Sequence, residues 1–365
     1  MKSHQHTLHK VSLLAALTLV AITSSAQVTG GNSYGYGLNA QADAGTGASL
    51  SLLALPPVSA NATVIAGPFP STAHGSAPAP YNTGLQSTVA ANANLVSVAG
   101  LNLSSGLASA NATVNLVTAS GTLNGEADSN VNGSPGSKSA HGFGSVQGLS
   151  LNLVDLGIAA TTALGVDASV NPPPLIGFAQ VGNALFTSDS TVSGVPFGYT
   201  RTGSSVIADL SISINGGSAV SLSSLATAAG ISYSLSSGAL VGVPANSVIT
   251  LGVTASGGLP GLGGGALSLN AGTQLRLVLN EQILDGDPNT SPRITTTALH
   301  LDFDLPGVGL TVPALTSLNV HGGTDVWIAQ SQAQLVPEPS SPALAALFAA
   351  MVCCHWRRFA GRTRC

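Results

Sequence analysis

Apolar and polar residues alternate along several segments of the chain with the two-residue period of a half-buried β-strand. In ALHLDFDLPG (298–307), the pattern predicts one face with Leu299, Leu301, Phe303 and Leu305 and an opposite face with His300, Asp302 and Asp304. SVITLGVTASG (247–257) and GTQLRLVLNEQIL (272–284) alternate in the same way. These segments are predicted to be strands with one face towards a core.

A hairpin is predicted in ADLSISINGGSAVSL (208–222). The apolar positions Leu210, Ile212 and Ile214 precede Asn215-Gly216, and the pattern resumes at Val220 and Leu222. Asn-Gly is a pair that tolerates positive φ, as tight turns between antiparallel strands require.

The first half of the chain is rich in Ala, Ser, Gly and Asn and gives less contrast. SVAGLNL (97–103) returns as SVQGLSL (145–151), and we interpret the two copies as similar strands of an antiparallel sheet. Residues 132–142, 171–174 and 256–265 contain Gly and Pro clusters that indicate surface loops. The expected fold class is all-β, with sandwich-like antiparallel layers and Gly/Ser/Asn-rich loops, and a β-solenoid is the alternative.

The composition supports an ordered domain with an unusual surface. Hydrophobic residues make up 44% of the 365 residues, but charged residues only 7%, against roughly 25% in typical soluble domains. Disordered chains combine low hydrophobicity with high net charge, which is the opposite combination. The surface must therefore be covered mainly by Ser, Thr, Asn and Gly.

The charges are segregated along the chain. Between Gln27 and Val336 lie four basic residues, Lys138, Arg201, Arg276 and Arg293, against thirteen of the fourteen acids, a net charge of −9. Binding to DNA or RNA requires a basic surface that replaces phosphate counterions. This body has none, so nucleic acid is excluded as a partner.

Residues 1–26 have the features of a secretory signal peptide. A basic segment ends at Lys10, an apolar stretch follows, and Ser24 and Ala26 take the −3 and −1 positions of a cut before Gln27. A retained anchor helix is the alternative. The three cysteines lie at positions 353, 354 and 365, so the exported body, 27–335, is expected to fold without disulfides.

Residues 336–365 have the features of a membrane-directed tail. Ala343 to Trp356 carry no charge and are predicted to form a short hydrophobic helix, and four arginines follow at 357, 358, 362 and 364. By the positive-inside rule, Arg357, Arg358, Arg362 and Arg364 stay cytoplasmic and the body lies outside.

The order of motif, apolar helix and arginine cluster, starting from Val336, Pro337, Glu338 and Pro339, resembles the PEP-CTERM sorting signal of Gram-negative bacteria. The resemblance implies a secreted protein held transiently in the membrane by its tail and processed near the motif by a protease of the exosortase type. It implies a location in the cell envelope, at the cell surface or in the extracellular matrix. A plain tail-anchored membrane protein is the alternative.

The body has a second resemblance. TQLRLVLNEQ, ITTTALHLDF and GTDVWIAQSQAQL, within 273–335, are similar to conserved blocks of the secreted proteins called choice-of-anchor P. That family pairs one exported body with different carboxyl-terminal anchors. The resemblance implies an anchored surface protein and no particular chemistry.

Two short motifs match catalytic or cofactor sequence patterns but lack the secondary structure that these patterns require. GNSYG (31–35) fits the G-x-S-x-G pattern of a nucleophile elbow but has no following helix. GLGGGA (261–266) is followed by an alternating strand where a dinucleotide site requires a helix. We therefore expect no enzyme, with a hydrolase using scattered Asp, Ser and His as the least favoured class.

One candidate metal site remains. His300, Asp302 and Asp304 share a strand face, and the nearby DGDPN segment supplies Asp285, Asp287 and Asn289 as oxygen ligands, which suits calcium. The twelfth position counted from Asp285 is Thr296, so this is not an EF-hand loop. The alternative is a solvated strand face beside an Asp-Gly turn, with no cofactor. His74, His141 and His321 are isolated in the sequence and are interpreted as ordinary surface residues.

Carbohydrate is the second candidate ligand. Exopolysaccharide is a candidate partner because exosortase systems resemble exopolysaccharide machinery. Aromatics make up only 4% of the chain, and Trp327 is the one Trp outside the tail. In DVWIAQSQAQL it is expected to share a face with Ala329, which favours burial in the core over a sugar-binding platform. The favoured function is therefore a non-catalytic structural, matrix or adhesion protein of the surface or a biofilm, and a calcium- or polysaccharide-binding module is the alternative.

Overall fold

The computed structural model describes residues 28–50, 58–66, 72–76, 81–88, 93–105, 108–132, 134, 136–162, 167–170, 173–253, 256–258, 266–269, 273–312 and 316–337. Within these residues the chain forms strands β1 to β21 and one short helix, α2 (Leu222–Ala228). The predicted signal peptide and the tail beyond Pro337 lie outside them. All strand pairs are antiparallel, which confirms the expected all-β class.

The strands form two sheets. The first contains, in hydrogen-bonded order, β16 (Ser247–Gly252), β19 (Gln274–Asp285), β20 (Arg293–Val312), β21 (Thr316–Pro337), β1 (Val28–Leu50) and β2 (Val58–Ala66). Three short strands extend it: β18 (Ala266–Leu269) pairs with β20, β17 (Ser256–Gly258) with β18, and β3 (Thr72–Ser76) with β1.

The second sheet is built around β7. Its order is β13 (Val220–Ser221), β12 (Leu210–Ile214), β9 (Ile176–Gln180), β7 (Lys138–Thr162), β10 (Phe186–Val195), β11 (Gly198–Ala208), β15 (Ala239–Val241) and β14 (Ser234–Ser236). β7 also pairs with β6 (Ala108–Ser129) and β8 (Asp167–Val170), and β6 pairs with β4 (Tyr81–Thr88) and β5 (Ala93–Ser105).

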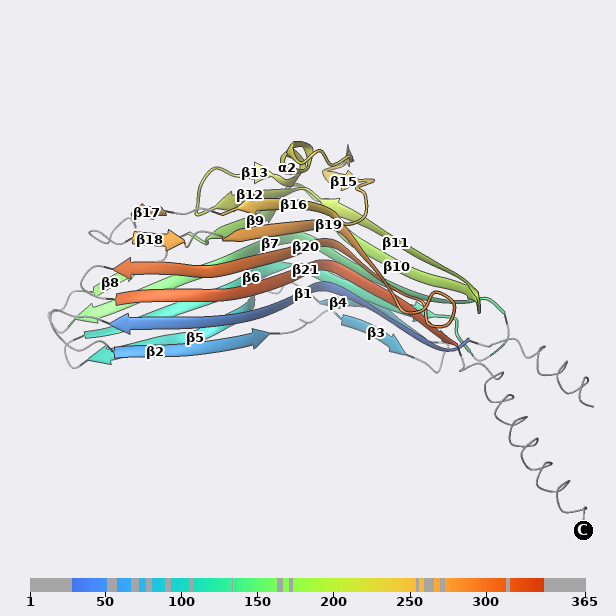
Figure 1. Ribbon diagram of the computed structural model, residues 1–365, viewed down its shortest axis with the longest axis horizontal. Helices are drawn as coiled ribbons and strands as arrows, with labels where there is room; N and C mark the ends of the chain where they lie inside the picture. Colours follow the sequence, from blue (N-terminus) through green and yellow to red (C-terminus); the bar gives the residue numbers. More distant parts are fainter. Residues whose placement is uncertain are drawn as a thin grey trace, which may run out of the picture.

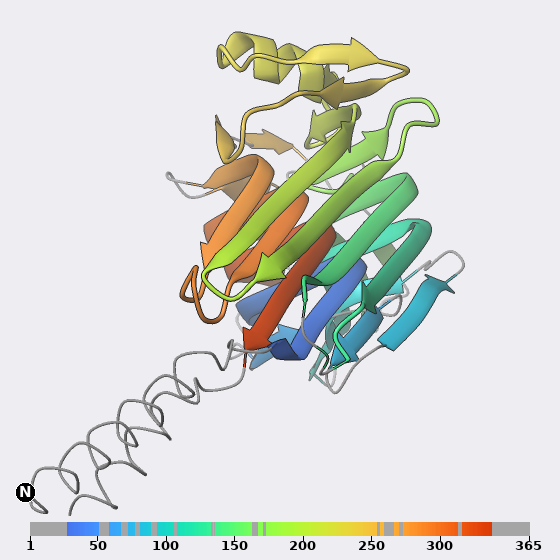
Figure 2. The ribbon, with the colours of Figure 1, turned by 90° about the vertical axis from the view of Figure 1, so that its right-hand side faces the viewer.

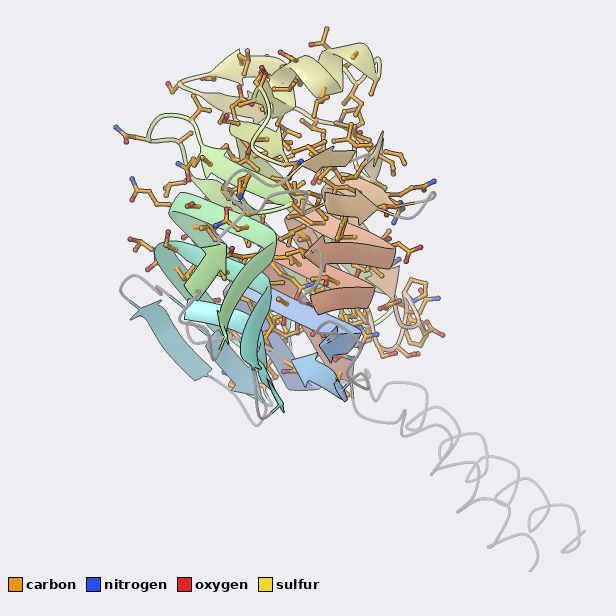
Figure 3. All side chains as sticks on the ribbon, turned by 90° about the vertical axis from the view of Figure 1, so that its left-hand side faces the viewer. Atoms are coloured by element: carbon orange, nitrogen blue, oxygen red, sulfur yellow. The ribbon has the colours of Figure 1, made fainter. Side chains whose placement is uncertain are left out.

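The two sheets pack face to face, and their inner faces enclose the core (Figures 1 and 3). The main core cluster joins alternate residues of both sheets, among them Leu38, Leu151, Leu153, Phe178, Leu277, Leu299, Leu301 and Phe303. The predicted inward face of 298–307 is confirmed where side chains are described, because Leu299, Leu301 and Phe303 are buried. The layered antiparallel arrangement corresponds to the predicted sandwich, not to the β-solenoid.

Along one line across the first sheet, the alternation of inward-facing and outward-facing residues shifts by one position in each strand. We call this line the kink line. It crosses Asn280 in β19, Ala298 in β20, Ala329 in β21 and Gly37 in β1, where the strand pairing skips one residue. Asn280 and Ala329 have positive φ values of 49° and 51°. In β1, odd positions 31 to 37 are buried on one side of the line and positions 38 and 40 on the other. Figure 1 shows these strands bending at the same level.

On one side of the kink line the sheets approach so closely that their contact is made by glycine. A β-carbon on Gly144 of β7 would overlap the backbone oxygens of Tyr36 and Gln330 on the facing strands, and one on Gly142 would overlap those of Tyr34 and Gln332. Facing sheets usually lie about 10 Å apart, which leaves room for side chains. Buried hydroxyls link the sheets beside this glycine seam, where Ser190 donates to Thr296 at 2.9 Å.

Beyond the glycine seam, a second small apolar cluster closes the sandwich. It consists of Val28, Val131, Ala140, Val192, Ile294, Ala333 and Leu335. Val28 at the start of β1 pairs with Pro337 at the end of β21. We call this end of the sandwich, with Val28, residues 335–337, the β10–β11 turn and the β19–β20 loop, the terminal end.

The predicted hairpin is confirmed, with one addition. Asn215 and Gly216 have positive φ, and Ile212 pairs with Val220. The returning strand is only two residues long, because Ser221 caps α2 by accepting the backbone N–H of Ser224 at 3.1 Å. The alternating pattern did not reveal this helix.

The internal echo is also confirmed as two strands of one sheet. Residues 97–103 lie in β5 and residues 145–151 in β7, and both strands flank β6. In each copy the pairing with β6 is irregular around the glycine, Gly100 or Gly148. The repeated sequence therefore forms two strands whose pairing with β6 is irregular at equivalent positions.

Candidate functional site

A histidine on the outer face of the first sheet lies between two carboxylates. The Nδ1 atom of His300 in β20 is 3.1 Å from Oε1 of Glu281 in β19, and its Nε2 atom is 3.1 Å from Oδ1 of Asp325 in β21. Since carboxylate oxygens only accept, both ring nitrogens donate when both bonds are made, and the imidazole then carries a positive charge. Burial lowers the pKa of His300, but the two hydrogen bonds and the two negative charges raise it overall to about 9.

The ring of His300 also stacks on Trp327, with ring centroids 4.9 Å apart and an interplanar angle of 20°. The expectation that Trp327 faces the core is wrong. Ile328 and Ala329 are both buried, because β21 changes phase at the kink line. Trp327 therefore lies on the outer face, only partly buried, and one face of its indole is occupied by His300.

The second sheet has the same arrangement around His141 in β7. Its Nδ1 atom is 3.2 Å from Oδ2 of Asp128 in β6, and its Nε2 atom is 3.2 Å from Oδ2 of Asp189 in β10. The hydrogen bond to Asp189 is the largest cause that raises the pKa of His141 to about 9, against the opposing effect of burial. The same bond lowers the pKa of Asp189. The interpretation of His141 as an isolated surface residue is wrong.

The site around His141 also has a geometry that could hold a metal ion. One ligand atom each from Glu126, Asp128 and His141 lies within 4.8 Å of the others, and all three residues are partly buried. Imidazole and carboxylates are ligands for zinc and other transition ions, but the imidazole must be neutral to bind. With its pKa raised to about 9, His141 holds a proton at neutral pH that a metal ion would have to displace.

The six residues predicted to form a calcium site do not come together. Asp285 pairs with Arg293 at the start of β20, while His300 lies seven residues further along that strand, a separation of about 23 Å. The prediction failed because closeness in the sequence was taken for closeness in space.

Each part of that set has other partners or surroundings. His300 is bound by Glu281 and Asp325, Asp302 lies 3.7 Å from Arg276, and Asp285 lies 2.8 Å from Arg293. Asp287 accepts the backbone N–H groups of Asn289 and Thr290, which is the bonding of an Asp-initiated turn. Asp304 is exposed opposite Gln274.

The sequence did not indicate the carboxylates that surround the two histidines. Asp128 and Asp189 are 13 and 48 residues from His141, and Glu281 and Asp325 are 19 and 25 residues from His300. The one signal in the sequence was their outward position in alternating strands. Strand order alone, which the sequence does not reveal, makes them neighbours.

The remaining motif residues are placed as follows. Ser33 of GNSYG is fully buried inside β1, so this segment is a strand and not a nucleophile elbow. Val336 and Pro337 of the predicted sorting motif are the last residues of β21. Glu338, Pro339 and the arginines at 357, 358, 362 and 364 lie outside the described residues.

Comparisons with known proteins assign no family. No protein-family model matches the chain, and no curated protein matches it significantly. Among solved structures it is similar to the outer membrane protein OprG from Pseudomonas aeruginosa, with 8% identity, a TM-score of 0.17, and coverage of 85% of this chain and 98% of that chain. A match at this TM-score carries no argument about function. Among the residues that the structure describes, no helix is long and apolar enough to cross a membrane.

Proposed function

We propose that this chain is an exported, non-catalytic structural protein of the bacterial cell surface or extracellular matrix, with a role in adhesion, biofilm or envelope coating. One observation carries the proposal. β1 and β21, the first and last strands of the body, pair along nearly their whole length, from Val28–Pro337 to Leu50–Thr316. The chain therefore enters and leaves the sandwich at one end, which suits a body tethered at that end and projecting away from it.

The same pairing supports processing near the Pro-Glu-Pro motif by a membrane protease of the exosortase type. Pro337 is the last residue of β21, and Val336 pairs with Gly30. A cut after Glu338 would leave every strand of the first sheet complete. Removal of the tail is then compatible with a folded body in the envelope or the matrix.

Mass spectrometry of the protein from its native host tests this proposal. We expect an amino terminus at Gln27 and a carboxyl terminus within 337–339, in material recovered from the cell surface or the medium. An intact Cys365 in purified membranes would instead indicate permanent anchoring. Uncut, full-length protein in the cytosol would overturn the proposal.

A second candidate function is binding of a divalent cation, which the grouping of Glu126, Asp128 and His141 favours. Calorimetric titration of the protein with zinc and with calcium tests it. The variant Asp128→Asn should abolish binding, while Asp302→Asn, on the other sheet, should leave it unchanged. Flat titrations of the unmodified protein with both ions would remove this candidate.

A further inference from the structure

The terminal end of the sandwich exposes large apolar side chains. Of eleven such residues among the described side chains, five lie here: Val195 and Phe197 at the β10–β11 turn, Ile283 and Leu284 near the end of β19, and Val336 at the end of β21. Phe197 is the most exposed, at 70%. Apolar residues gathered at one place on a weakly charged surface indicate an interaction site.

The segments that carry these residues form one surface. The backbone N–H of Phe197 donates to the carbonyl of Asn289 in the β19–β20 loop at 3.4 Å, and that of Leu335 donates to the carbonyl of Pro292 at 3.2 Å. Arg201 donates to the carbonyl of Asp285 at 3.2 Å. Figure 2 shows the β10–β11 turn, the β19–β20 loop and the end of β21 close together at this end.

Phe197 has a backbone conformation that is unusual for a large apolar residue. Val195 pairs with Gly198, and in the two-residue turn between them Pro196 is followed by Phe197 with a φ of 66°. That position normally carries glycine or asparagine, and the left-handed conformation costs other residues roughly 1–2 kcal/mol. The Phe197 side chain is mostly exposed and adds little to the core, so its apolar surface is available for an interaction.

Charge and chain path identify the partner. The terminal end contains Lys138, Arg201 and Arg293 against Asp285, Asp287 and the adjoining Glu338, so it carries no net charge on a body with a net charge of −9. An anionic lipid surface therefore repels this end less than it repels the body as a whole. Five residues separate Pro337 from Ala343, where the apolar run begins, and the six steps between these two residues reach at most about 21 Å. A bilayer that receives this run therefore lies within that distance of Pro337, at the same end of the sandwich as Phe197.

We propose that the terminal end rests on a lipid bilayer, with Val195 and Phe197 inserted into the interface. The apolar face of an interfacial amphipathic helix is buried about 5–10 Å into the boundary between headgroups and acyl chains, and we expect a comparable depth for these two side chains. The β10–β11 turn then orients the sandwich on the membrane for as long as the uncut tail holds it there. This inference rests on the proposed function only for the attachment of the chain to a membrane.

The test uses the full chain in vesicles of phosphatidylethanolamine and phosphatidylglycerol, part of which carries bromine on the acyl chain near the glycerol backbone. Phe197→Trp places a fluorophore in the proposed contact, and Leu235→Trp, an exposed apolar position in β14, serves as the matched control. Trp327 and Trp356 contribute equally to both variants. We expect a blue shift of emission and additional bromine quenching for Phe197→Trp alone.

Equal quenching of the two variants would overturn the proposal. A blue shift of Phe197→Trp that grows with protein concentration without lipid would also overturn it, because a second copy of the chain would then cover this end. Val195→Trp provides the same readout if Phe197→Trp does not fold. Failure of export would appear in the terminal masses from the host and leaves the vesicle experiment unaffected.

Discussion

At the residue scale, the two sheets share one electrostatic arrangement. Each has a histidine on the middle of three neighbouring strands and a carboxylate on each flanking strand, with nitrogen–oxygen distances of 3.1 Å at His300 and 3.2 Å at His141. A protonated imidazole between two carboxylates ties three strands together by charge-assisted hydrogen bonds. Four of the six ion pairs among the described residues are these histidine–carboxylate contacts.

These pKa values predict a loss of stability at alkaline pH. The folded pKa of both histidines, about 9, lies above the ordinary value of 6.5. Their contribution is therefore complete below about 6.5 and is lost as the pH rises through about 9. The lowered pKa of Asp189 has the opposite consequence, a contribution that is lost as the pH falls through that lowered value.

Denaturant unfolding across this pH range checks the prediction. The free energy of unfolding should fall with rising pH. His300→Gln should be less stable at neutral pH by about 1.5–3 kcal/mol, and its free energy of unfolding should fall less steeply with pH. An unchanged pH dependence in the double variant His141→Gln and His300→Gln would contradict the assignment.

The glycine seam predicts an effect of one added methyl group. Gly144→Ala should destabilise the protein by about 1–3 kcal/mol or more, because the sheets must separate locally to admit a β-carbon. Gly252→Ala, in an edge strand, is the control, since a β-carbon added there would meet nothing within 4 Å. Thermal unfolding of both variants tests the close approach of the sheets. Equal midpoint temperatures for the two variants would contradict it.

At the element scale, the kink line decides which residues face the core. Asn280 has a φ of 49° and bonds in three directions: its Oδ1 accepts from Ser205 at 2.9 Å and from Gln282 at 3.2 Å, and its Nδ2 donates to the carbonyl of Val243 at 2.8 Å. Those bonds join β19 to β11 and to the segment before β16. The kink is thus held by a side chain as well as by the backbone.

Two substitutions at Asn280 separate these contributions. Asn280→Gly loses the side-chain hydrogen bonds but adopts the positive φ without strain. Asn280→Ala loses the same hydrogen bonds and must also adopt a positive φ that is unfavourable for alanine. We expect both variants to be destabilised, and the alanine variant to be the less stable by roughly 1 kcal/mol. Equal free energies of unfolding would show that the left-handed conformation at this position carries no cost.

At the scale of the whole molecule, the first and last strands occupy the interior of one sheet. β21 lies between β20 and β1, and β1 lies between β21 and the strands β2 and β3. The first sheet is therefore complete only when both ends of the body have been synthesised. Folding of the first sheet and the proposed tethering therefore involve the same two strands.

This arrangement predicts the distribution of hydrogen exchange. Backbone amides of β20, β21 and the first half of β1 should exchange by opening of the whole sandwich and be the slowest. Amides of β16, an edge strand, and of the two-residue strand β13 should exchange much faster. Mass spectrometry of peptides after exchange measures both groups, and comparable rates in β21 and β16 would contradict this topology.

The alternation in 272–284 and 298–307 and the Asn215-Gly216 turn were enough to predict strands and a hairpin from local pattern. The predicted faces failed at Trp327 and the predicted site failed at Asp285 and His300, each for a physical reason. A single left-handed residue reverses alternation without a mark in the apolar pattern. Asp285 lies beside the β19–β20 loop, whereas His300 lies seven residues further along β20, so these two residues are fifteen positions apart in the sequence and far apart in space.

The sequence by itself determined the all-β class, the weak charge of the body and the positions of its turns, because these depend on periodicity, composition and local backbone preferences. Only the tertiary structure decided which carboxylates meet His141 and His300, where the sheets touch through glycine, and that Val28 and Pro337 are partners. Those features depend on strand order and on contacts between distant segments. No local pattern in one chain encodes them.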